Sequence, residues 1–123
     1  MPTIMIVEDS TLVRERLREL LLEIPQLELV GEYDNSAAAI TALRQRAVDI
    51  LLLDIKLRGS DGLDVLRNAK ATLSNTTVVV FTNYAEAPYR DLFTQLGADY
   101  FFNKTHETEQ LRDTLIRLAN ANN

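Results

Sequence analysis

The 123-residue chain contains no cysteine and a single histidine, His106. The lack of cysteine excludes disulfide bonds, thiolate metal sites and cysteine nucleophiles, and one histidine is too few for a histidine-rich zinc site. Basic residues are also scarce, with 13 Lys and Arg against 18 Asp and Glu, so that the net charge is −5. This charge argues against direct binding of nucleic acid, because phosphate backbones attract a concentrated basic face.

Long apolar runs are missing as well. No stretch approaches the roughly 18 apolar residues of a membrane span, and the start, Met1-Pro2-Thr3, lacks the basic segment and apolar core of a signal peptide. The hydrophobic share of 46% and the charged share of 25% are typical of a globular protein that is long enough to form its own core. We therefore expect one cytoplasmic domain over residues 1–123 with no membrane contact.

Short apolar segments alternate with amphipathic ones along the whole chain. Five apolar runs predict buried strands, at residues 3–7, 27–33, 49–54, 77–82 and 100–103. Five segments with apolar residues three or four positions apart predict helices, near residues 10–24, 37–45, 63–69, 88–96 and 111–118. This alternation predicts right-handed crossovers and a mostly parallel sheet between two layers of helices, with a β-bulge expected at Gly31.

Side chains of chemical interest follow four of the five predicted strands. Glu8 and Asp9 follow the first strand and Asp54 follows the third, while Thr82 ends the fourth and Lys104 follows the fifth. Open parallel sheets bind their ligands beyond the carboxyl ends of the strands, so we expect these side chains to converge at one edge. Each alone has an ordinary explanation, such as a helix cap or a solvated lysine, and only their combination points to a site.

Three acids, a hydroxyl and an amine suit phosphoryl transfer. Clustered carboxylates favour Mg²⁺, with Mn²⁺ as an alternative, because a divalent cation relieves their mutual repulsion. A carboxylate can attack phosphorus to give an acyl phosphate, while the cation, the Lys104 ammonium and the Thr82 hydroxyl neutralise charge on the moving oxygens. The sequence has no glycine-rich nucleotide-binding motif, so the phosphoryl donor has to be a separate molecule.

In order and spacing, these residues resemble the receiver domains of response regulators in two-component signalling. The resemblance covers essentially the whole chain. Besides Glu8-Asp9, it rests on Asp54-Ile55-Lys56-Leu57-Arg58-Gly59-Ser60-Asp61-Gly62, on Phe81-Thr82, and on Gly97-Ala98-Asp99 leading to Lys104. It implies a flavodoxin-like, doubly wound α/β fold with five helices and the strand order 2-1-3-4-5.

The resemblance assigns the acids of this edge to phosphorylation and metal binding. It implies that Asp54 accepts a phosphoryl group from a phosphohistidine on a sensor histidine kinase or a histidine phosphotransfer protein. It also implies that Glu8, Asp9, Asp54 and the backbone carbonyl of Lys56 bind Mg²⁺. Turnover of an external substrate is not expected.

A conformational switch is implied by the same resemblance. Lys104 would contact the attached phosphoryl group, Thr82 would swing toward it, and Phe101 would turn inward. The signal would reach the face formed by the fourth helix, the fifth strand and the fifth helix, and a homodimer that forms on phosphorylation fits this scheme. Lys56 and Tyr84 occupy positions that tune the lifetime of the phosphoryl group, and Tyr84 is expected to shield it from water.

The sequence departs from the commonest family pattern at several positions. Phe101 stands where tyrosine is common, so the switch aromatic has no hydroxyl to hydrogen-bond. Arg58 and Thr105 stand where prolines are frequent. Without a proline at Thr105, the isomer of the Lys104–Thr105 peptide bond is left open.

Two other functions fit the same fold. One is a phosphorylation-independent pseudo-receiver that acts as a protein-binding module; the complete set of five residues argues against it. The other is a Mg²⁺-dependent phosphatase with an aspartyl intermediate, which the missing cap domain and the presence of Lys56 in place of a second acid disfavour. Because 123 residues leave no room for a DNA-binding domain, we expect either a downstream protein target or a C-terminal output domain outside this chain.

Overall fold

The apolar runs of the sequence form one five-stranded parallel sheet in the computed structural model, which describes residues 1–72 and 75–121. Its strands are β1 (Thr3–Val7), β2 (Glu28–Tyr33), β3 (Ile50–Leu53), β6 (Thr77–Thr82) and β7 (Tyr100–Asn103). The helices are α1 (Thr11–Leu22), α2 (Ser36–Gln45), α3 (Gly62–Thr72), α4 (Ala87–Gln95) and α5 (Thr108–Asn120). The order β2-β1-β3-β6-β7 confirms the predicted order, because β4 and β5 belong to a separate hairpin.

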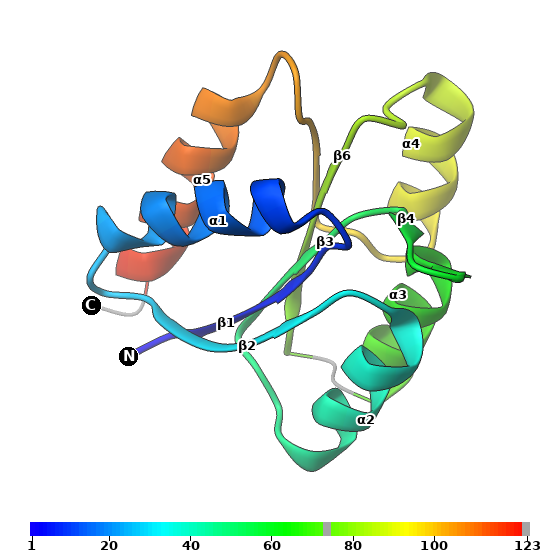
Figure 1. Cartoon of the computed structure of the whole chain (residues 1–123), viewed down its shortest axis with the longest axis horizontal. Coiled ribbons are helices and arrows are strands. Elements are labelled where there is room, and N and C mark those ends of the chain that lie inside the picture. Colours follow the sequence, from blue (N-terminus) through cyan, green and yellow to red (C-terminus); the bar gives the residue numbers. More distant parts are fainter. Residues whose placement is uncertain (73–74, 122–123) are drawn as a thin grey trace.

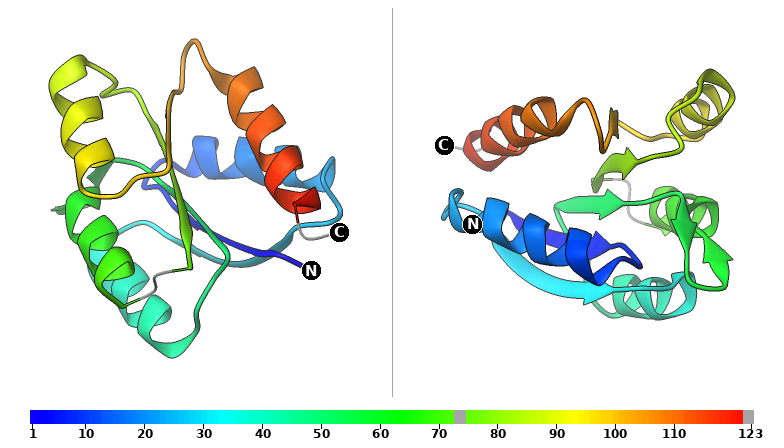
Figure 2. Two further views of the ribbon diagram at one scale, coloured as in Figure 1. Left: turned by 180° about the vertical axis from the view of Figure 1, so that it is seen from behind. Right: turned by 45° about the horizontal axis from the view of Figure 1, so that its top comes forward.

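Helices cover both faces of the sheet (Figures 1 and 2). Successive residues of a strand point to opposite faces, so each buried strand contributes to two apolar layers. In β7, Phe101 packs with the layer that contains α2, α3 and α4, while Tyr100 and Phe102 pack with the layer of α1 and α5. The two layers cover the strands from both sides. The carboxyl ends of the strands lie at the edge of the sheet, where they can form a site.

Local signals in the sequence explain where the first two helices begin. The Ser10 hydroxyl caps α1 by accepting the Val13 N–H at 3.2 Å, and the Asn35 side chain caps α2 by accepting the Ala38 N–H at 2.9 Å. The pairing of β1 with β2 shifts register between Ile4 and Met5, whose partners are Leu29 and Gly31. The extra residue between these partners confirms the predicted bulge next to Gly31.

The segment after Asp54 forms a short hairpin that the sequence did not predict. Strands β4 (Lys56–Leu57) and β5 (Ser60–Asp61) pair antiparallel as a hairpin, and Gly59 in its turn has a φ of +63°. The hairpin is fastened to the start of α2, where the Ser36 hydroxyl donates to the Asp61 carbonyl at 2.7 Å and the Ser36 N–H donates to the Ser60 hydroxyl at 3.0 Å. These bonds hold the chain that follows Asp54 in place.

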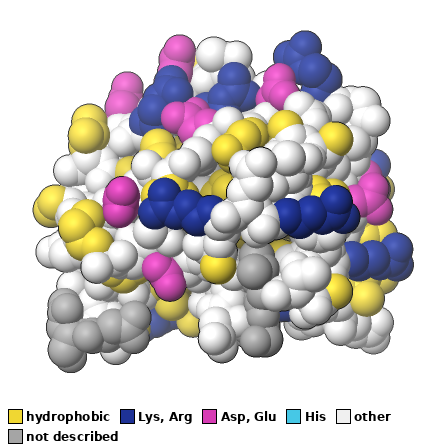
Figure 3. Space-filling model, turned by 90° about the horizontal axis from the view of Figure 1, so that it is seen from below, with side chains coloured by type: hydrophobic (Ala, Val, Ile, Leu, Met, Phe, Trp, Pro, Cys, Tyr) yellow, Lys and Arg dark blue, Asp and Glu magenta, His cyan; other side chains and the backbone are white. Residues whose placement is uncertain are grey.

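Basic, acidic and apolar side chains are interspersed over the face shown in Figure 3. Within residues 1–72 and 75–121, no helix combines the length and apolar character that a membrane crossing requires.

Candidate functional site

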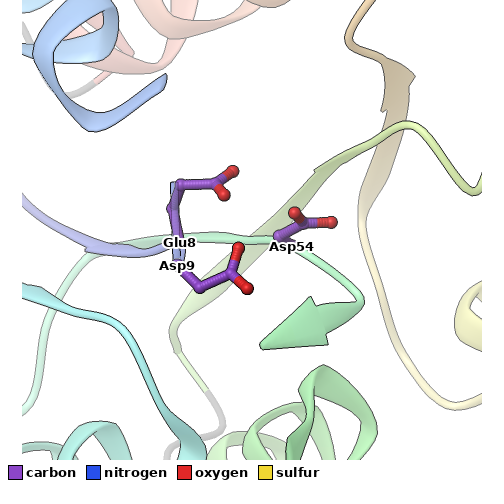
Figure 4. Close-up of side chains that lie close together, drawn as sticks. All are labelled: Glu8, Asp9 and Asp54. Carbon is purple, nitrogen blue, oxygen red and sulfur yellow. The ribbon is translucent and has the colours of Figure 1, made fainter. Parts of the chain in front are cut away.

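Three carboxylates converge where β1 and β3 end (Figure 4). One oxygen from each of Glu8, Asp9 and Asp54 lies within 4.8 Å of the others. Glu8 and Asp54 are buried and Asp9 is half-buried, so the cluster opens to solvent on the side of Asp9. The structure thus brings together the three acids that the strand ends predicted.

Lys104, which directly follows β7, joins this cluster. Its ammonium nitrogen lies 2.6 Å from Oε1 of Glu8 and 2.7 Å from Oδ2 of Asp54. The backbone N–H of Lys104 donates to the Thr82 carbonyl at 3.0 Å, which extends the pairing of β6 and β7 and keeps the lysine beside the acids. A half-buried cation therefore bridges two carboxylates that would otherwise repel each other.

Burial and charge set the protonation of the pocket. Burial raises the pKa of Glu8 from 4.5 to about 7; the Asp54 charge adds to this rise, and the Lys104 ammonium opposes it. Burial lowers the pKa of Lys104, but its hydrogen bonds to Asp54 and Glu8 outweigh that effect and raise it above its ordinary value. Lys104 is thus a fixed positive charge at neutral pH, whereas Glu8 titrates close to neutrality.

Both oxygens of Asp54 are oriented by neighbours. Oδ1 accepts the Ile55 N–H at 2.7 Å, and Oδ2 faces Lys104. Gly62 packs against the backbone of Asp54 so closely that a β-carbon would overlap the Asp54 carbonyl oxygen. Gly62 is therefore a residue that shapes the site, whereas from the sequence it was named only as the last position of the Asp54–Gly62 stretch.

Arg14 holds the turn that carries the first two acids. Its guanidinium donates to the backbone carbonyl of Glu8 at 2.6 Å, and its Nε lies 3.7 Å from Glu32. The Ser10 N–H donates to Oε2 of Glu8 at 3.0 Å, which fixes the side chain as well. Arg14 was not predicted from the sequence, where its place one helical turn after the cap of α1 was the available signal.

The predicted switch residue Thr82 is fully buried at the end of β6. Its hydroxyl accepts the Tyr84 N–H at 3.1 Å. Phe101 is also buried, only 7% exposed, and meets Phe93 edge-on with ring centres 6.4 Å apart. The ring thus lies inward, and its movement on phosphorylation stays a prediction.

The two predicted lifetime residues contact each other. The ammonium of Lys56 lies 5.5 Å from the ring centre of Tyr84 and 5.8 Å from that of Tyr89. The two tyrosine rings meet edge-on with centres 6.0 Å apart. The Lys56 side chain is thus directed to the aromatic rings, and the role of its backbone carbonyl in metal binding stays a prediction.

The donor set of the pocket fits a hard divalent cation. All three acids offer carboxylate oxygens, which Mg²⁺ prefers. Among the residues that the structure describes, Asp9 has no hydrogen-bonded or ionic partner for its carboxylate, while the oxygens of Glu8 and Asp54 already face a cation in Lys104. The pocket therefore has both the charge and a free ligand for such an ion.

Comparison with known proteins identifies the family to which this arrangement belongs. The family model described as the response regulator receiver domain matches residues 4–116. The chain is a receiver domain of this family. All five predicted site residues lie within the matched range, and the resemblance inferred from the sequence is confirmed.

Relatives of this receiver domain include response regulators. Response regulator UvrY of Escherichia coli is 29% identical over 104 residues, which cover 85% of this chain and 48% of UvrY. Response regulator GacA of Pseudomonas aeruginosa is 29% identical over 108 residues, which cover 88% of this chain and 50% of GacA. The chain thus spans about half the length of these curated relatives.

Solved structures share the fold of this receiver domain. A DNA-binding response regulator of the LuxR family from Staphylococcus aureus matches with a TM-score of 0.86 at 22% identity, covering 98% of this chain and 100% of that one. RcsB from Salmonella enterica serovar Typhimurium, bound to promoter rprA with the phosphomimetic BeF₃⁻, matches with a TM-score of 0.83 at 20% identity, covering 93% of this chain and 65% of that one. The predicted flavodoxin-like, doubly wound fold is confirmed.

Proposed function

We propose that this receiver domain is a phosphorylation-dependent signalling switch in which Asp54 accepts a phosphoryl group from a phosphohistidine. The observation that carries the proposal is the 2.7 Å contact between the Lys104 ammonium and the Asp54 carboxylate, in a pocket shared with Glu8. A cation beside a buried carboxylate is the arrangement that a phosphoryl acceptor needs, because charge develops on the transferred oxygens.

The transfer uses groups that are already in position. An oxygen of Asp54 attacks phosphorus as the P–N bond of the donor breaks. The donor phosphohistidine is protonated on its other ring nitrogen and keeps that proton, so it leaves as neutral imidazole. The Ile55 N–H restrains one oxygen of Asp54 at 2.7 Å, and this limits the rotation of the acceptor carboxylate. Lys104 then holds the negative charge that moves onto the phosphoryl oxygens.

In this proposal Glu8, Asp9, Asp54 and the backbone carbonyl of Lys56 hold Mg²⁺, with Mn²⁺ as a substitute. When bound, the ion neutralises charge on the phosphoryl oxygens and relieves the repulsion among the carboxylates. Glu8 has to be ionised to serve as a ligand, and its raised pKa makes metal binding compete with a proton.

The relay begins at Thr82. When its hydroxyl donates to a phosphoryl oxygen, the side chain moves toward Asp54 and the bond that it accepts from the Tyr84 N–H is strained or lost. This alters the segment between β6 and α4. Phe101 lies inward on the same layer as α4, so the change is passed to the face formed by α4, β7 and α5.

The partners follow from this chemistry. A separate phosphoryl donor is needed because the receiver carries no nucleotide-binding motif. In this proposal the donor is a sensor histidine kinase or a histidine phosphotransfer protein in the cytoplasm. The output is a downstream protein or a C-terminal domain outside this chain, as the greater length of UvrY and GacA supports. A homodimer that forms on phosphorylation is compatible with this output, and direct contact of the receiver with nucleic acid is not part of the proposal.

Intact-mass spectrometry tests the proposal. The wild type is incubated with acetyl phosphate and Mg²⁺, and we expect a gain in mass of one phosphoryl group. The gain should disappear in Asp54→Asn and when Mg²⁺ is removed. A wild type that gains nothing would favour the pseudo-receiver, and an Asp54→Asn variant that still gains mass would exclude Asp54 as the acceptor.

A further inference from the structure

We propose that Arg90 is a positioning residue that holds Phe101 inward, so that the aromatic part of the switch is preset. The geometry of this clamp stands by itself. Its consequence for signalling rests on the function proposed above.

Arg90 of α4 contacts Phe101 in two ways. The centre of its guanidinium lies 4.8 Å from the centre of the Phe101 ring, a cation–π distance, and Nη1 donates to the Phe101 backbone carbonyl at 3.1 Å. The same side chain therefore binds the ring and the strand from which the ring projects. Such a double contact restrains the ring relative to the backbone of β7.

Glu107 anchors the other end of Arg90. Nη2 of Arg90 donates to Oε1 of Glu107 at 3.2 Å. Glu107 is the N-cap residue of α5, but its side chain makes no capping bond and instead accepts the Asn103 N–H at 2.9 Å. The Glu107 N–H in turn donates to the Asn103 carbonyl at 2.9 Å, so Glu107 is tied to the end of β7 by two bonds.

These contacts form a bridge from α4 through β7 to α5, with the Phe101 ring inside it. The ring has Arg90 against it and Phe93 edge-on, so an outward turn would break both contacts. Only a planar guanidinium can make the ring contact, the carbonyl bond and the carboxylate bond together, because it presents several N–H donors in a fixed fork. Lysine could replace the charge but not the bridge.

The bridge also ends next to the phosphorylation site. Asn103 immediately precedes Lys104, whose ammonium contacts Asp54. If Phe101 is already inward, none of the free energy of phosphoryl binding is needed to reorient it, and the phosphoryl group has only to move Thr82. We therefore expect the orientation of Phe101 to be insensitive to phosphorylation in the wild type, and to become sensitive when Arg90 is removed.

Nuclear magnetic resonance of ¹³C-labelled phenylalanine rings tests this directly. For the wild type we expect a single Phe101 environment, with contacts to Phe93, both in the free protein and with Mg²⁺ and BeF₃⁻. For Arg90→Ala we expect a second, exchanging environment in the free protein that disappears when BeF₃⁻ binds. The apparent affinity for BeF₃⁻ should fall by on the order of tenfold.

Arg112→Ala is the matched control. Arg112 is as exposed as Arg90, at 44% against 41%, and it also forms an ion pair, with Glu23 at 3.8 Å, but it lies away from Phe101. We expect its Phe101 spectrum and BeF₃⁻ affinity to match the wild type. Arg90→Lys should show only part of the wild-type behaviour. Glu107→Gln is a milder change that should shift the Phe101 spectrum in the same direction as Arg90→Ala, and it replaces Arg90→Ala in the test if Arg90→Ala does not fold.

Two outcomes would overturn the inference. One is a Phe101 ring that keeps a single inward environment in both Arg90→Ala and Glu107→Gln. The other is a wild-type ring that lies outward in the free protein and turns inward with BeF₃⁻. A wild type that binds no BeF₃⁻ at all would contradict the proposed function instead, while the spectra of the free proteins would still decide the role of Arg90.

Discussion

The ammonium of Lys104 lies 2.7 Å from the carboxylate of Asp54, in a part of the site that water reaches poorly. Lys104 therefore does two things at once: it balances the negative charge of the resting pocket, and it is placed to receive the charge of an incoming phosphoryl group. Because Glu8 shares the same ammonium, any change at Lys104 should affect stability and phosphorylation together.

Removal of Lys104 should destabilise the metal-free protein. In Lys104→Met the carboxylates of Glu8 and Asp54 lose their counter-ion, and we expect the free energy of unfolding at pH 8 to fall by about 3 kcal/mol. The loss should be smaller at pH 6, where Glu8 binds a proton, and Mg²⁺ should recover much of it. Denaturant unfolding with and without Mg²⁺ measures these effects, and unchanged stability at pH 8 would show that the pair contributes little. Mass spectrometry should show slower phosphorylation.

Stability should also depend on the protonation of Glu8. The pKa of Glu8 is about 7 in the folded protein and 4.5 in an unfolded chain. Between pH 4.5 and pH 7 the folded protein therefore binds one more proton than the unfolded chain. The stabilisation by this proton, about 3 kcal/mol, is complete below pH 4.5 and is lost as the pH rises through 7. Urea unfolding from pH 5 to pH 8 without Mg²⁺ should show this decline in the wild type and a flatter profile in Glu8→Gln. Parallel profiles would contradict the raised pKa.

The same proton should weaken metal binding in acid. Below pH 7 Mg²⁺ has to displace a proton from Glu8, so we expect its apparent affinity to fall as the pH is lowered. Calorimetric titration with Mg²⁺ at pH 8 and pH 6 measures this change. An affinity that is equal at both values would indicate that Glu8 is not a ligand or is already ionised at pH 6.

The contrast between β3 and the β4–β5 hairpin shows what the sequence could predict. Four consecutive apolar residues, Ile50–Leu53, are enough to predict a buried strand that Asp54 follows at its carboxyl end. Because the strands are parallel, their carboxyl ends meet at one edge of the sheet, and this predicts that the site residues converge there. Strands of two residues leave no periodicity to detect, so the hairpin was missed. The contact of Arg90 with Phe101 was missed for another reason, because it depends on side-chain rotamers across separate elements, which no spacing rule describes.

Tyr84 should lengthen the life of the phosphoryl group. Tyr84 is 41% exposed, and the cation–π contact with Lys56 restrains its ring two residues after Thr82. From there we expect the ring to hinder an attacking water. We expect Tyr84→Ala to dephosphorylate several-fold faster than the wild type and Tyr84→Phe, which keeps the ring, to match the wild type. Loss of radiolabel from the phosphorylated proteins gives both rates. An equal or slower rate in Tyr84→Ala would show that the ring does not protect the acyl phosphate.

Gly62 should be necessary for the shape of the acceptor loop. A β-carbon at Gly62 would overlap the Asp54 carbonyl oxygen, and because that oxygen belongs to the backbone the loop has to move. We expect Gly62→Ala to lower the free energy of unfolding by about 2 kcal/mol and to slow phosphorylation, as Asp54 shifts away from Lys104. Gly59→Ala is the control: its β-carbon would meet open space, and it should lose only about 1 kcal/mol through its positive φ and keep the wild-type rate. If Gly62→Ala is destabilised but phosphorylated at the wild-type rate, the close packing of Gly62 supports the fold without positioning Asp54.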